Sequence, residues 1–405
     1  MTFGEDYLRL LGQIGNFTKE VTGVSIIDAY FGPENLSPEK AKRRLTPEKL
    51  LMNLDVLIGE AREIDDELRR IAITSDLESL KVVVKWLSGE NIPYIRLVEG
   101  IFGIIPRKFG QNKVRKAQQI VEDACATFSG SDVSEKVLKW REESKISGEA
   151  LKKMVDTVIV ERTQEITGLF EKRIFVHFPT KVENKGVVYK TVTDEPWGAY
   201  NYYQGNYTSI NVFNIDRPFN RYGLIWTLCH EYEHHVANLF TEKYYRENKA
   251  LDLAAVLLNT KRCIISEGTA DCARDFLGLQ LGEEYGEFIE SLGNLGRMIG
   301  LNVAYMLNVE NVDDETAAEY MASEGFLPIE EARKGIRFSK PSTPDGKPNF
   351  FKPYIYTYFF GRRDYVSPIF QKARKKGKIK EFFQNLYLNP YSRSSATWKI
   401  AFSKI

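Results

Sequence analysis

The segment IWTLCHEYEHHVANL, residues 225–239, is the most informative part of the chain. Its apolar residues recur every three or four positions, which is the spacing of one face of an α-helix. His230 and His234 are one helical turn apart, so their imidazoles project from the same side of this helix. The pattern predicts a core helix that carries two histidines. Its apolar face consists of Ile225, Leu228, Tyr232, Val236 and Leu239.

The histidines are concentrated in this segment. The chain has 4 of them, and His230, His234 and His235 all lie within residues 230–235. Histidine is the most common side-chain ligand of transition metals, and H-E-x-x-H places two of them on one zinc ion. Glu231 is rotated from His230 by about 100° around the helix. This position beside the metal suits a general base that accepts a proton from water.

A third ligand is expected from the segment Ser266-Glu267-Gly268-Thr269-Ala270-Asp271. Catalytic zinc sites usually have three protein ligands and one open position. Glu267 follows His234 at a distance that allows the first helix to end and a second helix to return, so we predict that Glu267 is the third ligand. Asp271 lies one turn further on, where its carboxylate can accept the free ring N–H of His230 or His234.

The rest of the chain predicts a mainly α fold with a small antiparallel β-sheet, in two lobes around a central cleft. Residues 1–175 are expected to form a helical N-terminal lobe, and residues 176–405 a catalytic lobe. Helical spacing recurs at 46–64, 77–87, 114–124, 148–171 and 353–389. β-branched and aromatic runs predict strands at 173–178, 186–192, 197–203 and 209–213.

Composition narrows the function further. Lys plus Arg (56) nearly balance Asp plus Glu (55), which gives no overall electrostatic case for binding nucleic acid or an anionic membrane. The N-terminus does not resemble a signal peptide, and no apolar run approaches the roughly 18–20 residues needed to cross a bilayer. The 4 cysteines form no C-x-x-C pair, so we expect buried thiols in a reducing compartment, with the cytoplasm as the location.

His230, Glu231, His234, Glu267 and Asp271 together resemble the gluzincin metallopeptidases, whose metal helix carries H-E-x-x-H and whose second helix carries a ligand Glu. The resemblance implies one Zn²⁺ per chain and a peptide substrate. More loosely, the layout resembles the mainly helical branch of carboxypeptidase Taq and the oligopeptidases. It also resembles a family of uncharacterised predicted peptidases with a double histidine and a Ser-Glu-Gly motif. Those predicted peptidases often space the histidines more widely, and residues 1–150 match no motif.

Further candidates come from two aromatic segments. Peptide hydrolysis requires a donor for the developing oxyanion, and relatives use a tyrosine from a late helix with a Tyr-x-x-Gly pattern, which here is Tyr358. Arg362 or Arg363 is expected to bind a substrate carboxylate, which would favour carboxypeptidase action. A further prediction is an edge strand that pairs with the substrate backbone. It would contain Gly198, Ala199 and Tyr200.

The remaining residues near the motif have structural interpretations. His235 points away from the metal, and we expect it to pack in the core, as we do Cys229 and Cys272. His177 is expected to be structural, and Glu233 to face solvent or a salt-bridge partner. Two other functions are compatible with the same residues: hydrolysis of a non-peptide amide or ester, and binding of a partner by a helical scaffold without catalysis. Exopeptidase and endopeptidase action fit equally well.

Overall fold

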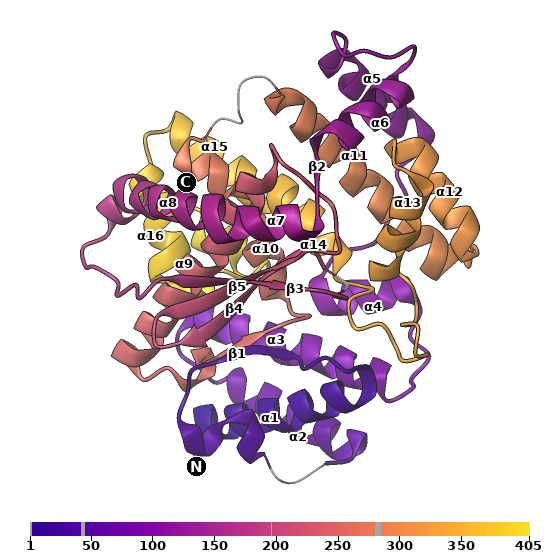
Figure 1. Cartoon of the computed structure of the whole chain (residues 1–405). Coiled ribbons are helices and arrows are strands. Elements are labelled where there is room, and N and C mark those ends of the chain that lie inside the picture. The colour runs from indigo at the N-terminus through magenta and orange to yellow at the C-terminus, as the bar shows by residue number, and fades with distance from the viewer. Residues whose placement is uncertain (1, 42–44, 196, 280–284) are drawn as a thin grey trace.

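The computed structural model describes residues 2–41, 45–195, 197–279 and 285–405. These residues form mainly helices with small sheets, so the predicted fold class is confirmed (Figure 1). None of the helices in these ranges has the length and hydropathy needed to span a membrane. The helices are α1 (Phe3–Thr22), α2 (Pro47–Ala61), α3 (Glu67–Leu87), α4 (Tyr94–Phe102), α5 (Gln111–Ala124), α6 (Val133–Ser144), α7 (Gly148–Met154), α8 (Val160–Arg173), α9 (Leu224–Asn248), α10 (Lys261–Leu277), α11 (Gly286–Tyr305), α12 (Asp314–Gly325), α13 (Ile329–Gly335), α14 (Ile355–Phe360), α15 (Ser367–Lys375), α16 (Ile379–Leu388) and α17 (Trp398–Ala401).

The predicted helical segments are present with local interruptions. The segment predicted at 148–171 is α7 and α8 joined by a π-helical turn, Val155–Ile159. The final block predicted at 353–389 is divided, because a second π-helical turn, Gly361–Val366, separates α14 from α15. The helix predicted from residue 46 is α2, which has Pro47 at its first position.

Helix α9 contains the histidine pair and is held by its apolar face. Leu228, Tyr232 and Val236 are at most 1% exposed, as the helical spacing predicts. The helix ends where Lys249 adopts a left-handed conformation with φ 54°. The neighbouring α10 begins after Thr260 and packs against α9. The predicted metal ligands lie on these two helices, which are therefore side by side.

The main sheet consists of β3 (Val187–Val192), β5 (Thr208–Asn214) and β4 (Ala199–Gly205), in that order. β4 and β5 are antiparallel, as predicted, and are joined by a tight loop in which Asn206 and Tyr207 have positive φ angles. β3 pairs with the other side of β5 and runs parallel to it, whereas the prediction was an antiparallel sheet. The sheet is therefore mixed.

One predicted strand is wrong. Residues 173–178 form the end of α8 and a 3₁₀ turn, Phe175–His177. The aromatic residues that suggested a strand pack on other rings instead: Phe175 contacts Phe170, and both Phe175 and Phe178 contact Phe240. Composition favoured a strand, but no strand in the described part of the chain pairs with this backbone.

Two short strand pairs join distant parts of the chain. β1 (Ile27–Tyr30) pairs with β7 (Ala255–Leu257), which lies between α9 and α10. β2 (Lys145–Ile146) pairs with β6 (Phe219–Asn220), just before α9. The first pair brings the N-terminal segment beside α9 and α10.

The hydrophobic cores divide the chain differently from the boundary predicted near residue 175. The larger core includes residues from Tyr7 to Ile405 and so unites α1–α4 with α9, α10 and the C-terminal helices. The smaller core joins α5 and α6 to α11–α13, which lie together at the upper right of Figure 1. Each of these two cores is built from separate stretches of sequence.

Candidate metal centre and its cavities

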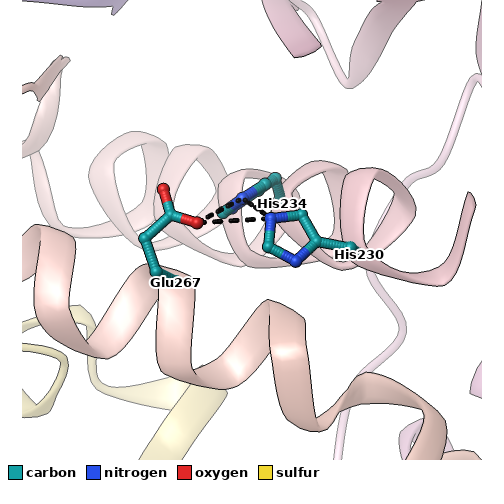
Figure 2. Close-up of side chains that lie close together, drawn as sticks. All are labelled: His230, His234 and Glu267. Atoms are coloured by element: carbon teal, nitrogen blue, oxygen red, sulfur yellow. Dashed lines mark hydrogen bonds and ion pairs between the residues drawn. The ribbon is translucent and has the colours of Figure 1, made fainter. Parts of the chain in front are cut away.

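Three donor atoms from α9 and α10 converge on one point (Figure 2). His230 Nε2 lies 3.2 Å from His234 Nε2 and 3.2 Å from Glu267 Oε2. His234 Nε2 lies 3.8 Å from the same carboxylate oxygen. The structure therefore brings together the three residues that were predicted as metal ligands.

The second nitrogen of each imidazole has its own partner. His230 Nδ1 lies 3.0 Å from Asp271 Oδ1, and His234 Nδ1 lies 3.2 Å from Ser266 Oγ. The Asp271 carboxylate can only accept, so it favours a proton on His230 Nδ1, and Ser266 Oγ can accept from His234 Nδ1 in the same way. With the protons on these atoms, both Nε2 lone pairs would be free to bind one cation. Asp271 occupies the position predicted for it.

The Glu267 carboxylate is buried, and its two oxygens are in different situations. Oε1 accepts a hydrogen bond of 2.8 Å from the Tyr354 hydroxyl. Oε2 has no hydrogen-bond partner of suitable geometry among the described residues, although His230 Nε2 lies 3.2 Å away. Burial opposes ionisation of Glu267, but His230 and His234 outweigh it and lower the pKa. A buried anionic oxygen without a partner is costly, and a cation would satisfy it.

The donor set fits zinc. Tetrahedral Zn²⁺ has Zn–N distances of about 2.0–2.1 Å, so its ligand atoms lie roughly 3.3–3.4 Å apart. The separations of 3.2, 3.2 and 3.8 Å found here surround a space of that size. Two imidazoles and one carboxylate are also the ligand types of a catalytic zinc site.

Two glycines place the third ligand beside the late tyrosines. A Cβ on Gly268 would lie 2.4 Å from the carbonyl carbon of Gly361, and one on Gly361 would lie 2.1 Å from the carbonyl oxygen of Ile264. Side chains at these positions would therefore separate α10 from the start of the π-helical turn. The contact explains why a glycine directly follows Glu267 and why another follows Tyr358 by three positions.

Glu231 is 6% exposed and forms no hydrogen bond or ion pair within the described chain. Burial raises the pKa of its carboxyl group, while the imidazoles of His230 and His234 oppose this effect. The side chain lines the space around the cluster of His230, His234 and Glu267. A carboxylate that is close to the cluster and has no partner is available to accept a proton.

Two cavities meet at the cluster and correspond to the predicted central cleft. The first has a volume of about 150 Å³, and the second, on the side of α11, about 710 Å³. Trp197, Ala199, His230, Glu231, Phe338 and Tyr358 line both cavities.

Tyr358 lies at this junction, with its ring centroid 6.4 Å from that of His230. Burial raises its pKa well above 10, so the hydroxyl keeps its proton and is a hydrogen-bond donor. Its position is compatible with the predicted contact with an oxyanion.

The predicted edge strand is partly present. Gly198 precedes β4, Ala199 begins it, and β5 is the one described strand that pairs with β4. The Tyr200 hydroxyl donates a short hydrogen bond to Asp28 of β1, at the wall of the smaller cavity. Burial raises the pKa of Asp28 to about 6, although the Tyr200 hydrogen bond opposes this effect.

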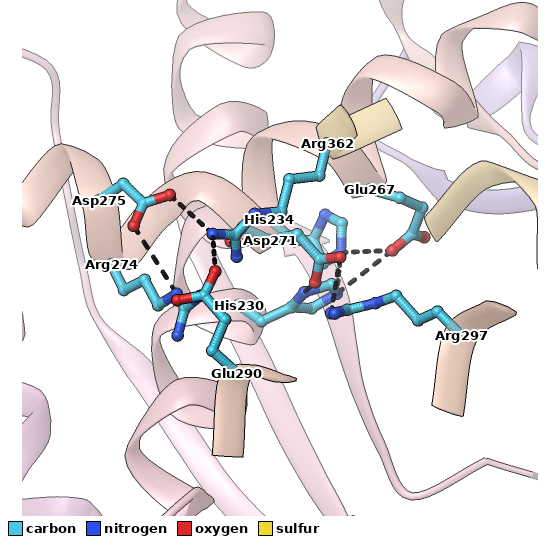
Figure 3. Close-up of polar contacts among 9 residues, drawn as sticks. All are labelled: His230, His234, Glu267, Asp271, Arg274, Asp275, Glu290, Arg297 and Arg362. Atoms are coloured by element: carbon cyan, nitrogen blue, oxygen red, sulfur yellow. Dashed lines mark hydrogen bonds and ion pairs between the residues drawn. The ribbon is translucent and has the colours of Figure 1, made fainter. Parts of the chain in front are cut away.

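The two predicted carboxylate-binding arginines have other partners. Arg362 donates to the backbone oxygen of Asp271 at 3.0 Å, and to Asp275 and Glu290 at 3.1 Å each (Figure 3). Arg363 pairs with Asp364 and lies over aromatic rings, and it lines neither cavity of the site. The structure therefore places Arg363 away from the site for which it was predicted, whereas Arg362 lines the larger cavity.

The other histidines and the cysteines are packed in the protein. His235 is completely buried and lies 2.8 Å from Ser209 Oγ and 3.0 Å from Asn184 Oδ1, and burial lowers its pKa to about 3. Its predicted packing role is confirmed. His177 stacks on Phe383, as expected for a structural residue. Cys229 and Cys272, with exposures of 1% and 0%, also belong to the larger core as predicted.

Glu233 departs from its prediction. It is 0% exposed and accepts a hydrogen bond of 3.1 Å from the Tyr387 hydroxyl. It does not reach solvent because α16 covers this face of α9. Burial raises the pKa of Glu233.

Four polar contacts of the site were not predicted from the sequence. Tyr354 lies one turn before Tyr358, a signal that could have suggested a shared helical face. Ser266 adjoins Glu267, but its contact with His234 depends on the packing of α9 on α10. Asp28 and Arg297, which lies 3.0 Å from Asp271 Oδ2, come from distant segments and carry no local signal.

The sequence matches no protein-family model and no curated protein. A crystal structure described as "the putative lipoprotein from Colwellia psychrerythraea" is similar over 96% of this chain and 69% of that one, with a TM-score of 0.55 and 15% sequence identity. A "putative lipoprotein of unknown function" from Shewanella oneidensis aligns over 92% of this chain and 76% of that one, with a TM-score of 0.47 and 14% identity. The first similarity concerns the fold alone.

Proposed function

We propose that this protein is a zinc-dependent hydrolase of peptide bonds. One observation carries the proposal. The two Nε2 atoms and Glu267 Oε2 converge without satisfying one another, next to a buried Glu231 that has no partner among the described residues. A structural zinc site would have a fourth protein ligand and would need no such carboxylate.

His230, His234 and Glu267 would hold the ion. Zn²⁺ supplies Lewis acidity there, which polarises a carbonyl group and makes water a stronger acid. The neighbouring side chains keep the ligands in position. Asp271 orients the His230 ring, and Tyr354 holds Glu267 Oε1 so that Oε2 faces the imidazoles.

Glu231 and Tyr358 would perform the proton transfer and the oxyanion stabilisation. Glu231 accepts a proton from the attacking water and later transfers it to the nitrogen of the leaving amine. The water oxygen forms a bond to the carbonyl carbon, and the C–N bond then breaks. The Tyr358 hydroxyl donates a hydrogen bond to the developing oxyanion. Burial raises the pKa of Tyr358, so its hydroxyl keeps the proton that it donates. Burial also raises the pKa of Glu231, which makes its carboxylate a stronger proton acceptor than an exposed one.

The edge strand favours a peptide over another amide or an ester. β4 pairs with β5 on one side, and Ala199 at its start lines both cavities. An extended peptide could form backbone hydrogen bonds with such an edge. A small ester has no peptide backbone that could form these hydrogen bonds with the edge of β4.

The decisive experiment combines metal analysis with a peptide digest read by mass spectrometry. We expect Glu231→Gln to retain stoichiometric zinc and to lower kcat by about 10²–10⁴-fold, the usual contribution of general-base catalysis. Glu247→Gln is the matched control on α9, since that side chain is 58% exposed and lies outside both cavities. Full activity of Glu231→Gln would exclude the assigned role. A wild-type protein loaded with zinc that cleaves no peptide would exclude the peptidase function.

A further inference from the structure

The larger cavity has a wall rich in arginine. The cavity extends from His230 and Glu231 to α11, which belongs to the smaller core. Gly293 and Gly296 of α11 line the cavity and have no side chains that would fill it. Its lining includes Arg217, Arg274, Arg297 and Arg362. A substrate bound at the metal cluster would extend into this space.

Three of these arginines are neutralised by three carboxylates (Figure 3). The three guanidinium groups are paired with three carboxylates, so positive and negative charges are equal in number. The contacts are Arg274 with Glu290 at 3.1 Å, Arg297 with Asp271 at 3.0 Å, and Arg362 with Asp275 and Glu290 at 3.1 Å each. These guanidinium groups stabilise the wall and are not free to bind a substrate anion.

Arg217 differs from the other three. It lies in the segment between β5 and β6, and it forms no ion pair with any described carboxylate. Among the described residues, its guanidinium group forms one long hydrogen bond, of 3.5 Å, to the backbone oxygen of Lys334. Burial lowers the pKa of Arg217, and the charge of a second cation, Arg337, adds to this effect.

An arginine in this position is electrostatically unsatisfied. A guanidinium remains protonated in proteins, so Arg217 keeps its charge despite partial burial. Leaving a charge partly desolvated without a counter-ion is unfavourable, and an incoming anion would relieve that cost. The planar fork of arginine matches a carboxylate, with which it can form two parallel hydrogen bonds.

We infer that Arg217 binds a carboxylate group of the substrate in the larger cavity, beside the metal cluster. The inference rests on the function proposed above and narrows its substrate class to peptides that carry a negative charge near the scissile bond. Both a C-terminal carboxylate and an acidic side chain provide this group. Arg217 thereby takes the role that the sequence had suggested for Arg362 or Arg363.

Binding measurements test this without depending on turnover. In the zinc-loaded Glu231→Gln background, calorimetry would compare N-acetyl-Ala-Ala, its C-terminal amide, and N-acetyl-Ala-Glu amide. We expect the free acid to bind more tightly than the neutral amide, and Arg217→Gln to remove this preference with an about ten- to hundredfold loss for the acid. Tight binding of the Glu amide would show that Arg217 also accepts the carboxylate of an acidic side chain.

Two further variants serve as controls. Arg217→Lys keeps the charge and should retain part of the preference, whereas Arg363→Gln, outside both cavities, should retain all of it. Equal affinity for acid and amide in the parent protein, or an unchanged preference in a folded Arg217→Gln variant, would overturn the inference. An Arg217-dependent preference in a protein that cleaves no peptide would leave the carboxylate site standing and remove the peptidase proposal.

Discussion

Tyr354→Phe is expected to weaken zinc binding while leaving all three ligands in place. The substitution removes one hydroxyl, which donates a 2.8 Å hydrogen bond to Glu267 Oε1. Both side chains are buried, with exposures of 6% for Tyr354 and 5% for Glu267. Water therefore has little access to replace the lost donor, and the Glu267 carboxylate is free to rotate away from the imidazoles.

The size of the effect follows from the type of hydrogen bond. A bond to an ionised group contributes about 1.5–3 kcal/mol, and each 1.4 kcal/mol changes an equilibrium constant about tenfold. The zinc Kd should therefore rise about ten- to hundredfold, which is the range for residues that orient metal ligands.

Competition with a chromophoric chelator would measure this change. Tyr356→Phe is the matched control, because it removes the same atom two positions later, at a residue of α14 that contacts Tyr94 and lines neither cavity. We expect this control to bind zinc like the wild type. A Tyr354→Phe variant with wild-type zinc affinity would refute the argument that this hydroxyl positions Glu267.

Three other changes have expected outcomes. Gly361→Ala should lower the free energy of unfolding by about 3 kcal/mol or more, because its Cβ would lie 2.1 Å from the Ile264 carbonyl oxygen; denaturant titration measures this. Asp28→Asn should be increasingly stabilising as pH rises. Burial raises the pKa of Asp28 to about 6, so the folded state holds this proton more tightly than the unfolded state. The free energy of unfolding of the wild type should therefore fall by about 3 kcal/mol relative to the variant between about pH 4 and pH 7. Removing zinc with a chelator should lower Tm, since an ion present at 1,000 times its Kd stabilises the folded state by about 4 kcal/mol.

Each of these outcomes has a control. Gly59→Ala, where nothing lies within 4 Å of the added Cβ, should not destabilise α2, so an equal loss in both glycine variants would contradict the steric argument. For Asp28, denaturation of the metal-free protein at several pH values is the measurement, and parallel stability curves for wild type and variant would contradict the shifted pKa. His234→Ala should show no chelator-dependent change in Tm, and a drop as large as that of the wild type would disprove its role as a ligand.

Local patterns predicted much of the fold. The α9 helix, most other helices and the strands β3, β4 and β5 follow from hydrophobic spacing and residue type, which act over a few residues. The segment at 173–178 was predicted wrongly because strand composition requires a neighbouring strand to pair with, and the fold provides aromatic rings instead. The parallel direction of β3 also depends on which strand became its neighbour.

For the candidate site, the sequence alone predicted the two imidazoles and Glu231, because spacing along one helix determines the direction of each side chain. It predicted Glu267 because a catalytic zinc site needs a third ligand and a second helix follows the first. The contacts that complete the site depend on folding. Asp28 reaches the smaller cavity through the pairing of β1 with β7, and Tyr354 reaches Glu267 through the close contact of Gly268 with Gly361. The assignment of the arginines also required the tertiary structure, since only the packed carboxylates distinguish the neutralised Arg362 from the unpaired Arg217. Sequence spacing specifies the direction of a side chain on its own helix, whereas the identity of its partner depends on which distant segments the fold brings beside it.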